Sequence, residues 1–150
     1  MNYQLILLFL ASLWFENAIS INEAQMKAGI KLIKNTCRTK TKITDEQIAK
    51  MHEGVWDDDD DGVWDDDDDV TKCYCHCALG MMKLQAKNGA FDHELFEKQK
   101  PIIPEVIRDP LIASVNNCVN AGEGLTKKCD LSYAFFKCVY LDDPEHYMFP

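Results

Sequence analysis

Cys73-Tyr74-Cys75-His76-Cys77 places three of the chain's seven cysteines within five consecutive residues. Cys73 and Cys77 are four residues apart, so in a helix they lie on one face, and each can reach a different neighbouring helix. Cys75 is rotated by about 200° from Cys73 around such a helix and faces away from that pair. The segment therefore predicts a central helix held between two others, with one cysteine left over.

The other four cysteines complete a spaced framework around this segment, at Cys37, Cys118, Cys129 and Cys138. With Cys75 left out, the intervals between successive cysteines are 35, 3, 40, 10 and 8 residues. Cysteines at this density behind an apolar leader favour disulfide formation in an oxidising compartment. The spacing alone does not fix which cysteines pair.

Residues 1–20 have the features of a signal peptide. The apolar run from Leu5 to Phe15 is too short to span a bilayer, and Ala18-Ile19-Ser20 after it resembles a signal-peptidase site. We expect cleavage after Ser20, which leaves residues 21–150 as the mature domain. No second apolar run is long enough for a membrane span, so we expect a secreted, extracellular product without stable membrane insertion.

The mature chain has the length of a single domain and an acidic charge balance. The whole sequence carries a formal net charge of −9, and ten of its acidic residues lie in two runs of aspartate. Binding to phosphate backbones requires a basic footprint, which this balance does not provide. We therefore expect no nucleic-acid partner.

Helical periodicity dominates residues 21–150, and no strand pattern competes with it. In the first expected helix Met26, Ile30, Ile33 and Cys37 form an apolar stripe, and a stripe of lysines that ends at Arg38 runs beside it. The fold class is therefore all-α, a compact bundle of six short helices.

Capping residues, glycines and prolines set the bounds of the other five expected helices. The second helix follows a capping box at Thr44 and Gln47 and ends at Gly54, and the third is capped by Asp69 and runs from Val70 to Lys87. The fourth runs from Asp92 to before Pro101. The fifth has Asp109 as N-cap, Pro110 at its first position and Gly122 at its end, and the sixth is capped by Asp130.

The segment between the second and third expected helices contains a tandem duplication. Gly54-Val-Trp-Asp-Asp-Asp-Asp-Asp61 repeats letter for letter as Gly62-Val-Trp-Asp-Asp-Asp-Asp-Asp69. Without one copy the first cysteine interval would be 27 residues, so the duplication lengthens a loop, residues 54–69, whose closure entropy rises slowly with length. Its aspartates repel one another, and we expect the loop to be solvated.

The duplicated segment also matches an EF-hand signature, at Asp57, Asp59, Asp61, Gly62, Asp65 and Asp68. Any duplicated aspartate run interrupted by glycine contains this pattern, the preceding helix ends early, and no second hand is present to pair with it. The Cys-His-Cys part of residues 73–77 lacks the four ligands of a closed zinc site once its thiols form disulfides. We therefore expect loose cation screening by the loop and no specific metal site.

The order of the cysteines resembles that of the insect odorant-binding (pheromone-binding) protein family: one cysteine, a long gap, two cysteines separated by three residues, a long gap, and a last pair separated by eight. Local sequence supports the resemblance from about Met26 to the end of the chain. The matching segments are Lys72-Cys73-Tyr74, Gly89-Ala-Phe-Asp92, Tyr133-Ala134-Phe135 and Asp143-Pro144-Glu145. The chain departs from the family pattern at Cys75 and in the acidic duplication.

The resemblance implies a helical bundle around an apolar cavity, stapled by three disulfides, Cys37–Cys77, Cys73–Cys129 and Cys118–Cys138. Each bridge typically contributes about 2–4 kcal/mol, which offsets the core packing that a hollow domain gives up. Cys75 is left as a free thiol or as the site of an intermolecular disulfide.

The function that the resemblance implies is reversible carriage of small hydrophobic ligands such as odorants or pheromones, with no cofactor and with a chemosensory receptor as an indirect partner. Burial of apolar ligand surface, at about 25 cal/mol per Å², drives such binding. Met81 and Met82 suit an adaptable wall, because thioethers refit irregular ligands. The candidate wall residues, each equally well explained as ordinary core, are Ile30, Ile33, Met81, Leu84, Val115, Val119, Phe135 and Phe136.

The tail, residues 142–150, is too apolar to be left in water without a reason. Tyr147, Met148 and Phe149 are candidate plugs or lids of the cavity. The nearby His146 and the acidic residues around it suggest that closure depends on pH. The alternative is a frayed terminus.

Two other functions stay open. An extracellular interaction protein without a small ligand would use the basic stripe of one copy, the acidic loop of another and Cys75 to form a homodimer, whereas a carrier is expected to be a monomer. A secreted phospholipase-like enzyme is less favoured, because the glycines of its calcium loop and its His-Asp pair are missing. No other catalytic motif occurs, so we expect no catalytic residues and no enzymatic activity.

Overall fold

The computed structural model describes residues 21–53, 64 and 66–150. The elements of this part are α2 (Glu23–Thr41), α3 (Asp45–Glu53), α4 (Asp69–Met81), α5 (His93–Gln99), the 3₁₀ helix η1 (Lys100–Ile102), α6 (Glu105–Asn117) and α7 (Lys128–Asp142). Within the described ranges the only β pairing is a single bridge between Gln85 and Phe91. The predicted all-α fold is confirmed. The expected signal peptide and most of the acidic loop lie outside the described residues.

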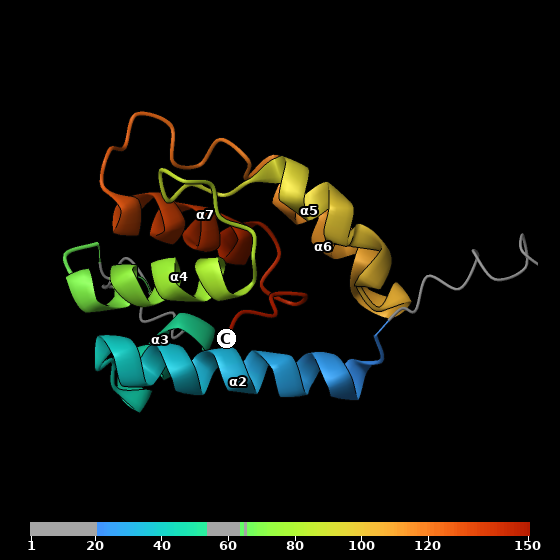
Figure 1. Ribbon diagram of the computed structural model, residues 1–150, viewed down its shortest axis with the longest axis horizontal. Helices are drawn as coiled ribbons and strands as arrows, with labels where there is room; N and C mark the ends of the chain where they lie inside the picture. Colours follow the sequence, from blue (N-terminus) through green and yellow to red (C-terminus); the bar gives the residue numbers. More distant parts are fainter. Residues whose placement is uncertain (1–20, 54–63, 65) are drawn as a thin grey trace, which may run out of the picture.

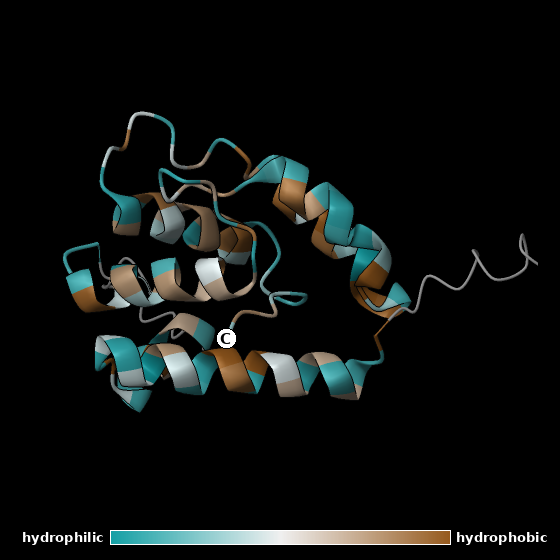
Figure 2. Ribbon diagram, viewed as in Figure 1, coloured by the Kyte–Doolittle hydropathy of each residue, from teal (hydrophilic) through white to brown (hydrophobic). Residues whose placement is uncertain are grey.

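α4 occupies the middle of the fold, with α2 along one side and α7 along the other (Figure 1). In Figure 1 α5 and α6 lie beyond one end of α4, and the His93 side chain at the start of α5 contacts Asn116 of α6. α3 follows α2 after a short turn, and its Asp45 pairs with Arg38 of α2. The tail leaves the end of α7 and runs back to a position beside α2 (Figure 1). The helices are banded with hydrophilic and hydrophobic residues, as expected for helices with one face in water (Figure 2).

Three disulfides link these helices. Cys37–Cys77 joins α2 to α4, Cys73–Cys129 joins α4 to α7, and Cys118–Cys138 joins the end of α6 to α7. The Cα–Cα distances of 4.6–5.7 Å fall in the usual range for disulfides. These are the three pairs that the family resemblance implies, and α4 is the central helix linked on both sides.

Cys75 is free and completely buried. It lies on α4 between Tyr74 and Ala78, which are also fully buried, because the central helix has neighbours on both sides. Burial raises the pKa of the Cys75 thiol and so disfavours the reactive thiolate. The free thiol is therefore the alternative that fits the fold, and an intermolecular disulfide does not fit, since the thiol does not reach the surface.

α4 ends earlier than the periodicity predicts. The helix stops at Met81 instead of Lys87, because Lys83 adopts a left-handed backbone with φ 57° and the chain then folds back through the Gln85–Phe91 bridge. Gly89 has φ 94° in this small hairpin, where glycine is favoured. At the other end the N-cap is Asp68 and not Asp69: its carboxylate accepts hydrogen bonds from the backbone N–H groups of residues 70 and 71.

α6 and α7 also begin earlier than predicted. α6 starts at Glu105 with Pro104 as N-cap, so Pro110 lies inside the helix and Asp109 is not a cap. Pro110 leaves the carbonyl of Val106 without its helical donor, and Val106 is exposed, so water can hydrate that group. α6 ends at Asn117, well before Gly122. α7 starts at Lys128 with Lys127 as N-cap, in place of the predicted Asp130.

The predicted capping signals of the other helices are present. Thr44 and Gln47 exchange hydrogen bonds between side chain and backbone at the start of α3, with N–O distances of 2.9 and 3.1 Å. Asp92 caps α5. A capping box of Asn22 and Gln25, which the sequence analysis did not identify, starts α2. The predicted end of α3 at Gly54 lies outside the described residues.

An aromatic cluster anchors the end of the acidic loop. The Trp64 ring, in the second copy of the duplication, packs edge-on against Tyr133 at a centroid distance of 5.3 Å and also contacts Tyr140 and Tyr147. Trp64 is 5% exposed and belongs to the core, so the expectation of a solvated loop is wrong at this residue. Among the described helices, none is long and apolar enough to cross a membrane.

Candidate ligand cavity

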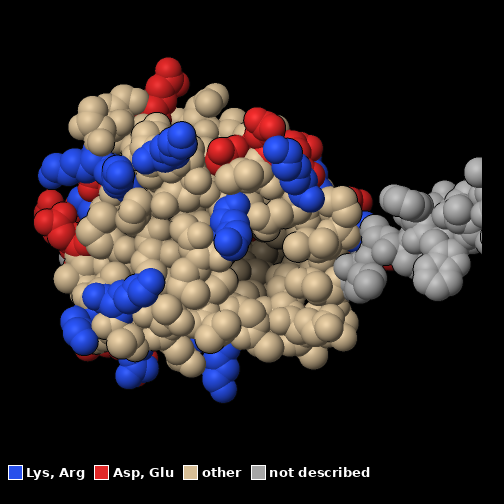
Figure 3. All heavy atoms as spheres, in the orientation of Figure 1, with Lys and Arg blue, Asp and Glu red and all other residues tan. Residues whose placement is uncertain are grey.

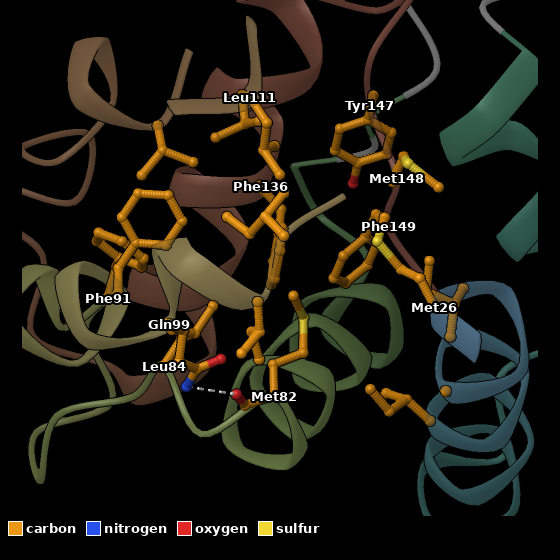
Figure 4. Close-up of a pocket in the computed structure, with 18 of the residues that line it drawn as sticks. Met26, Met82, Leu84, Phe91, Gln99, Leu111, Phe136, Tyr147, Met148 and Phe149 are labelled. Atoms are coloured by element: carbon orange, nitrogen blue, oxygen red, sulfur yellow. Dashed lines mark hydrogen bonds between the residues drawn. The ribbon is translucent and has the colours of Figure 1, made fainter. Parts of the chain in front are cut away.

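A cavity of about 270 Å³ opens between α2 and the end of the fold that carries α5 and α6. The surface is hollowed near the centre of the face shown in Figure 3, and Figure 4 shows the side chains around the space. The lining comes from α2, α5, η1, α6, α7 and segments next to the helices, but from neither α3 nor α4: Ile21, Gln25, Met26, Gly29, Ile30, Ile33, Met82, Leu84, Phe91, Phe96, Gln99, Ile102, Ile103, Leu111, Val115, Phe135, Phe136, Val139, Tyr147, Met148 and Phe149.

α2 supplies one wall. Met26, Gly29, Ile30 and Ile33 recur at helical spacing and all line the cavity. The only buried residue of α2 is Cys37, at the disulfide. The apolar stripe of this helix therefore faces the cavity over most of its length instead of a tightly packed neighbour.

α7 supplies the opposite wall, which is largely aromatic. The Phe135 ring stacks on Phe91 with a centroid distance of 4.0 Å and an interplanar angle of 7°, and Phe91 in turn contacts Phe96 of α5. Phe136 contacts the tail, with its ring centroid 3.7 Å from that of Phe149. These stacked rings give the wall a fixed shape.

The tail forms the third wall. Tyr147, Met148 and Phe149 line the cavity between α7 and the Met26 end of α2 (Figure 4). Phe149 is 4% exposed, and the Tyr74 hydroxyl donates a hydrogen bond of 2.5 Å to the Pro150 carbonyl. His146 pairs with Asp143 at 2.8 Å, within the tail itself. The alternative of a frayed terminus does not fit these contacts.

Three lining residues carry polar side chains, and within the described residues no charged side chain lines the cavity. The Gln25 Oε1 accepts a hydrogen bond from the Asn22 backbone at 2.9 Å. The Tyr147 hydroxyl is enclosed and has no hydrogen-bond partner in the described part of the chain, and burial raises its pKa. The Gln99 Nε2 donates to the Met82 and Lys83 carbonyls at 3.2 and 3.1 Å.

Two of the predicted wall residues lie elsewhere. The Met81 sulfur lies 3.6 Å from Sγ of Cys37, so Met81 packs on the Cys37–Cys77 disulfide while Met82 lines the cavity. Val119 falls in the turn after α6, because α6 ends at Asn117 and its predicted register does not continue. The structure places Ile30, Ile33, Leu84, Val115, Phe135, Phe136, Tyr147, Met148 and Phe149 in the lining.

The largest group of lining residues that sequence reasoning missed comes from residues 91–103, and the others lie on α2, α6 and α7 and at Ile21. Phe91 reaches the cavity because the hairpin after α4 folds back, and Ile102 and Ile103 reach it through η1. A signal for part of this group existed in the sequence, since Ile102-Ile103 is apolar and lies between Pro101 and Pro104, which mark an irregular connection.

Charged side chains pair outside the cavity. The Lys137 ammonium lies 2.7 Å from Asp66 and lowers the pKa of that carboxyl. Burial opposes ionisation of Asp68, but hydrogen bonds from Thr71 and Gln47 outweigh it and lower its pKa. Asp68, the last position of the EF-hand match, is thus occupied in capping α4. The remaining EF-hand positions lie outside the described residues, and the described part holds no cluster of three potential metal ligands.

Comparisons with known proteins agree with the helical fold and the cavity described above. The model of the PBP/GOBP family matches residues 20–141. General odorant-binding protein 72 of Anopheles gambiae is 26% identical over 132 residues, which cover 87% of this chain and 100% of that protein.

Two solved structures share the fold and most of the length. Odorant binding protein 4 of Chrysopa pallens is 38% identical with a TM-score of 0.74, over 87% of this chain and 99% of that one. Odorant binding protein 5 of Apis mellifera is 27% identical with a TM-score of 0.67, over 88% of this chain and 100% of that one. The chain therefore belongs to the PBP/GOBP family of odorant-binding proteins.

Proposed function

We propose that this protein is a secreted carrier that takes up small hydrophobic ligands in the cavity and releases them again. Its family and its fold support a carrier of small ligands rather than an enzyme. The observation that carries the proposal is the cavity itself, which has apolar walls on three sides. We further propose a monomer without catalytic activity, which reaches a chemosensory receptor only through its cargo, and removal of residues 1–20 as a signal peptide.

The driving force in this proposal is burial of the ligand. Each buried methylene contributes about 0.8 kcal/mol, and the costs of lost translation and ordering offset a large part of the sum. Walls held by disulfides lower the ordering cost, because α2, α4 and α7 are linked before the ligand arrives. The volume of about 270 Å³ is close to the lower end of the ~300–1,000 Å³ of known ligand pockets, which suits a small ligand.

Gly29 offers a direct test of the cavity. It belongs to the lining stripe of α2, and a Cβ atom added there meets nothing within 4 Å. Gly29→Trp should fill the space next to Ile30 and weaken binding of N-phenyl-1-naphthylamine at least about tenfold, while the helix gains from losing a glycine. Gly29→Ala is the matched control and should bind like wild type. A folded Gly29→Trp variant with wild-type affinity would show that ligands bind elsewhere.

We also propose that the tail closes the cavity. Deletion of residues 147–150 removes three lining side chains and the carbonyl that accepts the Tyr74 hydrogen bond. The truncated protein should bind the same probe several-fold more weakly at pH 7. A change in this difference at pH 5 would support the predicted pH dependence of closure. Unchanged affinity at both values would remove the tail from the mechanism.

No observation favours the alternative of a covalent homodimer. Cys75 is fully buried in α4, so a bridge to a second copy would require this central helix to leave the core. Non-reducing electrophoresis of wild type beside Cys75→Ser checks this point, and a band of twice the mass that the substitution abolishes would revive the alternative.

A further inference from the structure

We propose that Gln99 selects, among apolar ligands of this cavity, those that carry a hydroxyl group. The proposal rests on the carrier function above and adds the class of ligand. Gln99 is the last residue of α5 and lines the cavity next to Leu84 and Met82 (Figure 4). Its side-chain oxygen presents a hydrogen-bond acceptor to a space whose other side chains, apart from Gln25 and Tyr147, are apolar (Figure 4).

The orientation of the Gln99 amide is fixed by the turn after α4. Nε2 donates to two successive backbone carbonyls, Met82 at 3.2 Å and Lys83 at 3.1 Å. A flipped amide would place its oxygen against these two carbonyl oxygens, which cannot donate a hydrogen bond. The nitrogen therefore stays on the side of the turn, and Figure 4 shows the amide oxygen on the cavity side.

Gln99 Oε1 accepts no hydrogen bond from any residue that the structure describes, and the other two polar side chains of the lining differ from it in this or in their burial. Gln25 Oε1 is engaged by the Asn22 backbone, and the Tyr147 hydroxyl is buried, with almost no accessible surface of its own. A ligand in the cavity thus meets one accessible, oriented acceptor. A hydroxyl can donate to it, but an ether, ester or ketone turns its own lone pairs toward it and leaves it unpaired.

The test compares two isomers of equal size, decan-1-ol and 1-methoxynonane, by displacement of N-phenyl-1-naphthylamine. The quantity of interest is the ratio of their affinities, alcohol over ether, within each variant. Gln99→Leu keeps an apolar side chain of similar size but has no acceptor, so this ratio should fall about three- to tenfold from its wild-type value. An unchanged ratio in a folded Gln99→Leu variant would overturn the inference.

Gln25→Leu is the matched control. It removes the other amide of the lining, whose oxygen already has a partner, so the wild-type ratio should persist even if both affinities change. A ratio that falls equally in Gln25→Leu and Gln99→Leu would show a general effect of wall polarity and would overturn the assignment to Gln99.

A second measurement on wild type covers the case that Gln99→Leu does not fold, since the amide also anchors the turn at Lys83. In ¹H–¹⁵N spectra the Gln99 side-chain amide should shift on titration with decan-1-ol and stay nearly constant with 1-methoxynonane. Equal shifts with both isomers would overturn the inference and leave the carrier function intact. Binding of neither isomer, nor of the probe, would overturn the carrier function itself.

Discussion

The cavity has two sides that are built in different ways. On the linked side the wall helices α2 and α7 are joined through α4, which does not itself line the cavity, by Cys37–Cys77 and Cys73–Cys129. On the unlinked side α5, η1 and the tail carry no cysteine and are held by side-chain packing and hydrogen bonds such as those of Gln99 and Tyr74. The difference suggests that the linked side keeps the cavity open and that the unlinked side adjusts to the ligand.

Loss of a bridge on the linked side should have the largest effect. The Cys73→Ser/Cys129→Ser double variant frees a loop of 56 residues, and loop-closure entropy predicts a loss of about 4 kcal/mol in the free energy of unfolding. Chemical denaturation followed by circular dichroism measures it. A loss below about 1 kcal/mol would show that side-chain packing alone fixes the linked side.

Truncation on the unlinked side should come next. Phe96 of α5 is 3% exposed and contacts Phe91, so Phe96→Ala should cost about 3 kcal/mol. Because Phe96 also lines the cavity, the variant should gain affinity for bulkier apolar probes relative to small ones. If the preference for probe size stayed as in wild type, the claim that the unlinked side sets the ligand fit would be wrong.

A smaller effect is expected at the buried thiol in the middle of the linked side. Cys75→Ser introduces a hydroxyl at a fully buried position and should cost about 2 kcal/mol, and Cys75→Ala should cost less. Wild type should not react with a thiol reagent at pH 8 until it unfolds, since burial raises the pKa of Cys75. Fast labelling of the native protein would contradict the tight packing of α4.

The smallest effect is expected where the hairpin after α4 connects the linked side to the unlinked side. There the Gln85 Nε2 lies 2.8 Å from Nδ1 of His76. Burial, with the nearby Lys128 charge, lowers the pKa of His76. The stabilisation by neutral His76 is therefore complete above the unfolded pKa of about 6.5 and is lost as pH falls from there through the lower folded pKa. His76→Asn keeps an acceptor toward Gln85, and its melting temperature should fall less between pH 7 and pH 5 than that of wild type. Equal slopes would exclude His76 as the source.

The sequence was more informative about the linked side than about the unlinked one. The cysteine spacing and the stripe of Met26, Ile30 and Ile33 predict helices whose position the disulfides then fix. The structure of the residues after Met81 was harder to predict. Lys83 ends α4 with a left-handed backbone, a conformation that favours glycine, and nothing in the helical pattern of the sequence predicts this end. The contribution of Phe91, Gln99 and Ile103 to the cavity follows from this early end.

Tertiary packing also overrode one local signal and decided one open alternative. Asp109-Pro110 has the chemistry of a helix start, yet Pro104 starts the helix one turn earlier and Pro110 is tolerated on an exposed stretch. The sequence leaves Cys75 open as a free or an intermolecular thiol, and packing decides between them because it lies on the buried face of α4 with Tyr74 and Ala78. Helix bounds and burial both depend on neighbours that a single sequence does not place.

Hydrogen–deuterium exchange with and without saturating decan-1-ol tests most directly whether the unlinked side adjusts to the ligand while the linked side stays fixed. We predict slower exchange on binding in α5, η1 and residues 143–150, and little change in α4 and α7, which the disulfides already hold. Equal protection of both sides, or no change anywhere at saturation, would contradict the account.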